Sequence, residues 1–205
     1  MSSIPTAIDQ SESPRSFLDE VYKSLGYEEG TLLSATSYPN SETYEEWLDK
    51  GDWLALAHKV GAEKVFFVKN DPVIIFCTLQ NNPQDEQSLL ETFRRVWCMS
   101  RPQILFIALP GELRLYRLDR PPTRDIESLR KNQQIELIKK VAEVAKKLQD
   151  YRREQVESGC LFGDSRFGGI DQRADKRLIQ DLKTVRKSLL ATDLEPQYAH
   201  ALIRR

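Results

Sequence analysis

The sequence predicts an α/β sandwich, in which helices pack on a β-sheet built from two hairpins. The first observation is a pair of apolar runs, Val65–Val68 and Val73–Leu79, separated by turn-forming residues. The second is a later pair, Gln103–Leu109 and Glu112–Leu118, separated by a Pro-Gly turn. The third is the segment between the two pairs, Asp85–Met99, whose apolar residues recur at helical spacing.

Two helices are expected before the first hairpin. A Ser-Pro pair at 13–14 opens the first of them, and its apolar face runs from Phe17 to Leu25. The segment Gly30–Asn40 is a loop or a short strand. The second helix spans about Ser41–Val60, and the step Lys50-Gly51-Asp52 is a candidate kink within it.

The second half of the chain is predicted to be helical. A Pro-Pro pair at 121–122 ends the sandwich, and apolar residues at helical spacing then predict one long helix, about Ile126–Val156. Two short amphipathic helices near the end cannot close a core alone, so we expect the chain to stop within a helical domain. The expected order is a disordered N-terminus (1–13), an α/β core (14–124), a long bracing helix (125–157), a linker (158–172) and the start of a helical connector (173–205).

Composition excludes several classes of function. The 205-residue chain has a formal net charge of −1, so a nucleic-acid-binding face would have to be a local patch. No apolar run approaches the roughly 20 residues of a membrane helix, and the N-terminus lacks the features of a signal peptide. Cys77, Cys98 and Cys160 lack metal-ligand spacing, which favours a reduced, cytoplasmic protein. With only two histidines and no nucleotide-binding glycine loop, we expect no cofactor.

The predicted order of helix, hairpin, helix and hairpin resembles the restriction-endonuclease-like fold. In that fold a carboxylate on one strand and an Asp/Glu-x-Lys triplet on the next hold Mg²⁺ and activate water. The first acid would fall at Glu63, but the triplet would fall at Cys77-Thr78-Leu79. A thiol is a poor Mg²⁺ ligand, and Leu79 cannot replace an ammonium group. We therefore predict a degenerate site with no metal and no catalytic residue.

Two groups of basic residues are candidates for phosphate contact. One lies on the helix between the hairpins and just after it, and the other lies in the C-terminal part, where basic residues outnumber acidic ones. A solvated helix face is the alternative explanation for both groups. The candidates are Arg94, Arg95, Arg101, Arg173, Lys176, Arg177, Lys183, Arg186 and Lys187.

The tail resembles a known family. Residues 172–190 (QRADKRLIQDLKTVRKSLL), followed by 199–203 (AHALI), resemble the linker of large single-chain restriction–modification proteins of the type IIG kind. In those proteins a nuclease-like N-terminal domain precedes an N6-adenine DNA methyltransferase. Residues 86–97, 104–108 and 111–116 are similar to the helix and last strands of the nuclease-like domain. The resemblance implies association with DNA, a role in phage defence and a methyltransferase domain or subunit as partner; the motifs of the methyltransferase itself are missing.

Three functions follow as hypotheses. The first is a catalytically degenerate nuclease-like module of a restriction–modification protein that helps it dock on DNA or on a partner. The second is a Mg²⁺-dependent DNA endonuclease whose second acid comes from Glu45, Glu46 or Asp52. The third is a protein–protein adaptor. Salt-dependent DNA binding distinguishes the first from the third, and metal-dependent cleavage identifies the second.

Overall fold

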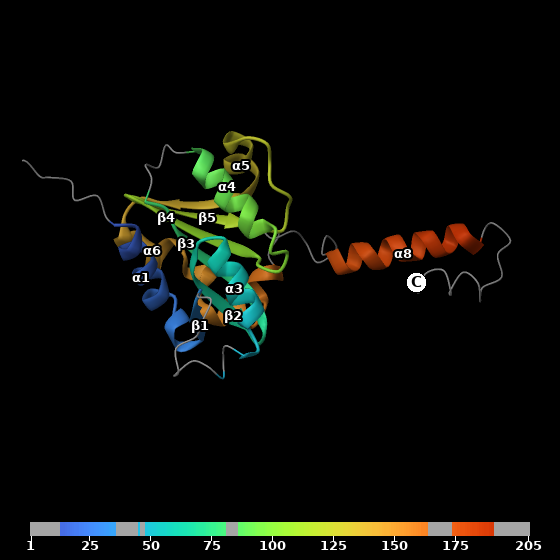
Figure 1. The fold of residues 1–205 in the computed structure, drawn as a ribbon, viewed down its shortest axis with the longest axis horizontal. Coiled ribbons are helices and arrows are strands. Elements are labelled where there is room, and N and C mark those ends of the chain that lie inside the picture. The colour runs from blue at the N-terminus through green and yellow to red at the C-terminus, as the bar shows by residue number, and fades with distance from the viewer. Residues whose placement is uncertain (1–12, 36–44, 46–47, 81–85, 164–173, 191–205) are drawn as a thin grey trace, which may run out of the picture. The chain divides into compact units, whose positions relative to one another are not determined.

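The computed structural model describes residues 13–35, 45, 48–80, 86–163 and 174–190. It divides into two units, Met1–Leu161 and Phe162–Arg205. The first unit contains an α/β fold, and the second contains helix α8 (Ala174–Leu190) (Figure 1). The side chains of α8 are described from 181 to 189.

The first unit is built on a six-stranded mixed sheet with the strand order β1-β2-β3-β4-β5-β6. Neighbouring strands are antiparallel except β3 and β4, which are parallel. A parallel pair needs a crossover connection, and helix α4 (Glu86–Trp97) lies in it. The strands are β1 (Thr31–Ser34), β2 (Ala62–Val68), β3 (Asp71–Thr78), β4 (Ile104–Leu109), β5 (Glu112–Arg117) and β6 (Gln134–Ile138).

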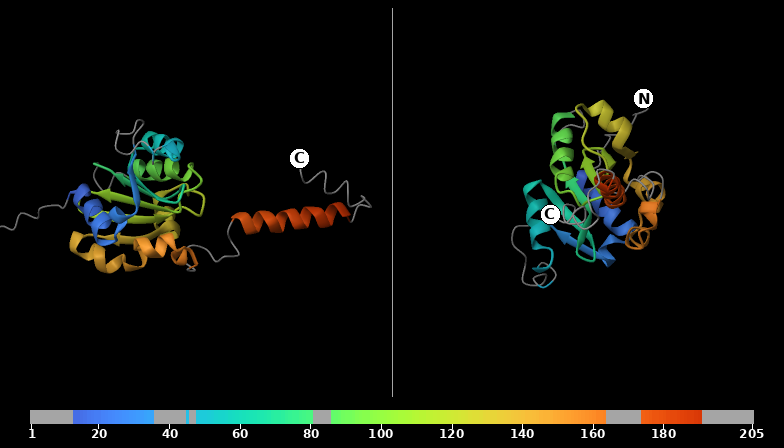
Figure 2. Two further views of the ribbon diagram at one scale, coloured as in Figure 1. Left: turned by 90° about the horizontal axis from the view of Figure 1, so that it is seen from below. Right: turned by 90° about the vertical axis from the view of Figure 1, so that its right-hand side faces the viewer.

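One face of the sheet is covered by three helices. These are α4, α3 (Gly51–Lys59) and α5 (Ile126–Gln133). Their side chains Leu54, Phe93 and Leu129 join alternate residues of the strands in one buried apolar cluster. The edge-on view in Figure 2 shows α3 and α4 on this side of the sheet.

The other face is covered by the N-terminal helix and by short helices that follow β6. Helix α1 (Pro14–Ser24) packs beside α6 (Val144–Lys147), and α7 (Arg153–Glu157) follows (Figures 1 and 2). The ring of Tyr22 meets that of Phe76 edge to face, with centroids 5.0 Å apart. The first unit is therefore a three-layer α/β/α sandwich, which confirms the predicted α/β class.

The predicted hairpins are confirmed. The first joins β2 to β3 at Lys69, whose φ of 58° is left-handed, and the second joins β4 to β5 at Gly111, whose φ is 77°. Glycine adopts this conformation without the steric cost that a Cβ imposes. The helix between the hairpins is also confirmed as α4, with Leu89, Leu90 and Phe93 buried.

The helices before the first hairpin agree in part with prediction. Helix α1 begins as predicted, because the side chain of Ser13 caps it by accepting a hydrogen bond from the Ser16 amide. The candidate kink at Lys50-Gly51-Asp52 is where α3 begins, and α3 buries Leu54 and Ala57 but leaves Leu56 exposed. Most of residues 36–47 lie outside the described residues. The segment Gly30–Asn40, predicted to be a loop or a short strand, contains strand β1.

The prediction of one long helix over 126–156 is wrong. Helix α5 ends at Gln133, and the chain turns directly into β6, an edge strand paired with β5. Ile135 and Leu137 alternate with polar residues, a period-two pattern that pairing with β5 stabilises over the helical alternative. Short helical segments follow, and they bury Val144 and Leu148.

The predicted C-terminal helix is confirmed over the residues of α8. The predicted disordered N-terminus up to residue 12, most of the predicted linker and the predicted last helix lie outside the described residues.

Candidate functional site

A β-bulge in β2 places two charged side chains on one face of the sheet. The register between β2 and β3 shifts between Ala62 and Lys64, and both Ala62 and Val65 belong to the apolar cluster that α3 and α4 cover. Glu63 and Lys64 therefore share the opposite face, on the side of α1. In a regular strand, adjacent side chains would point to opposite faces.

The side chain that meets Glu63 is Thr78. The Thr78 hydroxyl Oγ1 donates a hydrogen bond to Glu63 Oε1 at 2.7 Å. Cys77 lies on the other face, fully buried in the apolar cluster, and Leu79 packs against the same cluster. Of the predicted triplet Cys77 to Leu79, only Thr78 therefore contacts Glu63. The residues from Thr78 to Gln80 contain neither an acid nor a lysine.

Cys77 is a packing residue. Burial, and to a smaller degree the carboxylate of Glu63, raises the pKa of its thiol to about 12. The thiol is therefore neutral at physiological pH and behaves as a small apolar side chain. A neutral, fully buried thiol cannot act as a metal ligand or nucleophile.

An aromatic and a basic residue complete the surroundings of Glu63. Lys64 Nζ lies 4.3 Å from the centroid of the Tyr22 ring, a cation–π contact. Tyr22 is 1% exposed, and its hydroxyl has no hydrogen-bond partner within the described part of the chain. Burial first, then the carboxylates of Glu63 and Asp19, raise the pKa of this hydroxyl, so it stays protonated.

Sequence reasoning overlooked Lys64, Thr78 and Tyr22 as neighbours of Glu63. The bulge brings them together, and a bulge without a glycine has no clear signal in a single sequence. The sequence predicts Tyr22 only as a core residue, because it lies on the apolar face of α1.

Of the acids proposed as migrated ligands, Asp52 is not brought to Glu63. Asp52 is exposed on α3, which packs on the opposite face of the sheet, so this proposed position is wrong. Glu45 is exposed, and Glu46 lies outside the described residues. No group of three or more metal-ligating His, Cys, Asp or Glu side chains occurs within the described ranges.

The predicted DNA-contacting arginines of the first unit have partners within the chain. Arg94 Nη2 donates to the carbonyl oxygens of Thr123 and Arg124, at 3.2 and 3.1 Å, and so holds the loop before α5. Arg94 thus has a structural role. Arg95 and Arg101 form solvent-exposed ion pairs with acidic residues, both at 3.6 Å. Such exposed pairs contribute little to the stability of the fold, and they leave the guanidinium groups accessible to solvent.

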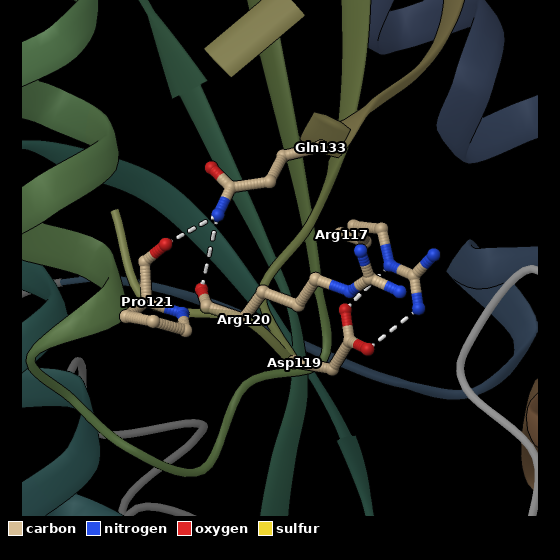
Figure 3. A network of polar contacts seen from close by, with 5 residues as sticks. All are labelled: Arg117, Asp119, Arg120, Pro121 and Gln133. Carbon is tan, nitrogen blue, oxygen red and sulfur yellow. Dashed lines mark hydrogen bonds and ion pairs between the residues drawn. The ribbon is translucent and has the colours of Figure 1, made fainter. Parts of the chain in front are cut away.

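A further polar network fixes the chain where β5 ends (Figure 3). Arg117 forms two hydrogen bonds with the carboxylate of Asp119, at 2.5 and 2.6 Å. The carboxamide of Gln133, 1% exposed, donates to the carbonyl oxygens of Arg120 and Pro121 (Figure 3). This network anchors the end of α5 to the loop after β5, and its role is structural.

The basic candidates on α8 lie in the second unit. Lys183, Arg186 and Lys187 are exposed. Lys176 and Arg177 lie on the same helix, but their side chains are outside the described part, as is Arg173. The exposed side chains on α8 therefore remain candidates for contact with an anionic partner.

Comparison with family models, curated proteins and solved structures finds no match. Among the helices within the described ranges, none is long and apolar enough to cross a membrane.

Proposed function

We propose that this chain is a catalytically degenerate nuclease-like module that helps a restriction–modification or phage-defence protein dock on DNA or on a partner such as a methyltransferase domain. The proposal rests on the resemblance of its sequence to such proteins and on the residues that surround Glu63.

The observation that carries the proposal is the hydrogen bond between Thr78 and Glu63. It joins two adjacent antiparallel strands at the position where the restriction-endonuclease-like fold would place its two acids. In this pair only Glu63 is a carboxylate, and its partner is the hydroxyl of Thr78. This arrangement is what we expect of a fold that has lost its catalytic residues.

The residues do not fit the Mg²⁺ site of such a nuclease. Mg²⁺ prefers several oxygen ligands in octahedral geometry, usually with one or two carboxylates. The Glu63 carboxylate already accepts the Thr78 hydroxyl, and the nearby Tyr22 hydroxyl is protonated and buried. The proposed function therefore includes no metal-dependent cleavage of DNA.

Docking on DNA is assigned to α8. In the first unit Arg94 is bonded to backbone carbonyls, whereas Lys183 and Lys187 are exposed four residues apart on one face of α8. Contacts of such lysines with phosphates strengthen binding and make it sensitive to salt.

The test is a binding and cleavage assay on the full chain. A labelled DNA duplex and a plasmid are incubated with the protein in Mg²⁺ or Mn²⁺ across a series of salt concentrations. We expect no cleavage and binding that weakens as salt rises. The Lys183→Glu/Lys187→Glu variant should bind more weakly at every salt concentration and reduce the salt slope by about 2.

The matched control is Lys139→Glu/Lys140→Glu, which makes the same change in net charge at exposed positions of the first unit. This control should bind DNA nearly as well as the wild type. Metal-dependent cleavage that Glu63→Gln abolishes would overturn the proposal in favour of an active nuclease. Absence of both cleavage and binding would leave the adaptor function.

A further inference from the structure

Helix α8 presents an apolar stripe to solvent. Leu182 is 39% exposed and Val185 is 48% exposed, and every residue from 181 to 188 is exposed. Leu189 continues the same line one turn further on. An amphipathic helix gains most of its stability by burying its apolar stripe against another element.

The spacing of this stripe fits a helix paired with a similar helix. Leu178, Leu182, Val185 and Leu189 are separated by four, three and four residues, the spacing of the a and d positions of a heptad. Leu182 and Leu189 take a positions, and Leu178 and Val185 take d positions. Two further apolar residues flank this seam, Ile179 at an e position and Leu190 at a b position.

The charges beside the seam select the partner and its direction. Asp181 takes a g position and Arg186 the following e position, five residues later, and both are exposed. In a parallel pair of identical helices, Asp181 of each copy faces Arg186 of the other, so two opposite-charge pairs form. In an antiparallel pair, g positions face g positions and e positions face e positions, so neither of these opposite-charge pairs forms.

We propose that the apolar stripe of α8 binds α8 of a second copy of this chain in a parallel coiled coil. The choice of a second copy of α8 as the binding partner follows from the a and d spacing together with the complementary charges at g and e. Lys183 and Lys187 take the b and f positions, which face away from the seam. This inference does not rest on the proposed docking function, and it leaves these lysines available to another partner.

The seam is short, because coiled coils are usually sustained over three or four heptads. We therefore expect association that depends on protein concentration. Leucine at a with a β-branched residue at d is a combination that also permits more than two strands. The number of copies is thus read from the measured mass, whereas the parallel direction follows from the charges.

The test is sedimentation analysis of the full chain over a range of concentrations. We expect the mean mass to rise with concentration for the wild type. Val185→Asp should remain monomeric throughout, because it places a carboxylate in the seam. Far-UV circular dichroism checks that this variant keeps the first unit folded.

Charge reversals test the direction of the helices. Asp181→Arg alone and Arg186→Asp alone each replace two attractive pairs with two repulsive ones, so the dissociation constant should rise about tenfold. The double variant Asp181→Arg/Arg186→Asp restores opposite charges in a parallel arrangement and should recover wild-type association. Lys183→Glu, at an outward position, is the matched control and should associate like the wild type.

Two results would overturn the proposal. One is a monomeric mass at every concentration, which would show that the stripe is covered by another segment or a different partner. The other is association that Val185→Asp leaves unchanged, or that the double charge variant fails to recover. DNA binding by a monomeric chain would support the docking function and still reject this inference.

Discussion

At Gly30, just before β1, the fold leaves no room for a side chain. A Cβ atom built there would lie 2.8 Å from a ring carbon of Phe66 and 2.9 Å from Cδ of Arg153. The Phe66 ring is fully buried, so it cannot move away freely. We expect Gly30→Ala to lower the free energy of unfolding by about 1–3 kcal/mol, the usual cost of overpacking.

Urea denaturation of Gly30→Ala measures this loss. The matched control is Gly163→Ala, because a Cβ at Gly163 would meet no heavy atom within 4 Å. The control should unfold at nearly the wild-type urea concentration. Equal midpoints for both variants would contradict the packing described at Gly30.

The buried thiol of Cys77 makes stability depend on pH. Its pKa rises from an ordinary 9.0 to about 12 in the folded protein, so between these values the unfolded chain loses the proton and the folded chain keeps it. Stability from this thiol is therefore fully present below pH 9 and is lost as pH rises toward 12. Unfolding free energies measured from neutral to alkaline pH should fall less steeply for Cys77→Ala than for the wild type.

Labelling of the three cysteines gives an independent check on Cys77. Cys98 and Cys160 are exposed, so both should react with a thiol reagent in the native protein. Cys77 should react only after denaturant is added, because the thiolate is the reacting form and burial suppresses it. Peptide mass spectrometry assigns each site, and rapid labelling of native Cys77 would contradict its burial.

Elements with local sequence signals were predicted well, and elements set by tertiary contacts were not. Helix α4 and both hairpins follow from apolar periodicity and turn residues in the chain itself. Strand β6 does not, because its residues also fit a helical pattern and only pairing with β5 selects the strand. The position opposite Glu63 was missed for a related reason: the bulge changes which side chains share a face.

Gln133 is the last residue of α5, directly before β6. Its buried carboxamide donates to two carbonyl oxygens of the loop after β5, and the next residue already has extended backbone angles. Gln133→Leu would leave these two carbonyl oxygens without the carboxamide donor and remove both hydrogen bonds. We expect the variant to lower the free energy of unfolding by about 1–3 kcal/mol.

Thermal or urea unfolding of Gln133→Leu checks this expectation. Gln103→Leu is the control, since the exposed side chain of Gln103 donates a local hydrogen bond to the carbonyl of Arg101. The control should change stability by less than about 0.5 kcal/mol. A neutral effect of Gln133→Leu would mean that the end of α5 is fixed by strand pairing alone.

On the scale of the whole molecule, the buried apolar core of the described residues runs from Phe17 to Leu161, within the first unit. Both faces of its sheet are covered, so this unit contains the layers that a domain needs to fold independently. We expect a fragment of residues 1–163 to fold and to unfold cooperatively, with a thermal midpoint close to that of the first unit in the full chain.

Circular dichroism and sedimentation of this fragment test the division into units. Relative to the full chain, the fragment should lose helical signal corresponding at least to the 17 residues of α8 and keep the near-UV signal of its buried aromatic side chains. It should also be monomeric at concentrations where the full chain associates, because the seam of α8 is absent. A lower thermal midpoint for the fragment would show that the sandwich depends on residues 164–205 for stability, and association of the fragment would place the self-binding surface on the sandwich instead of α8.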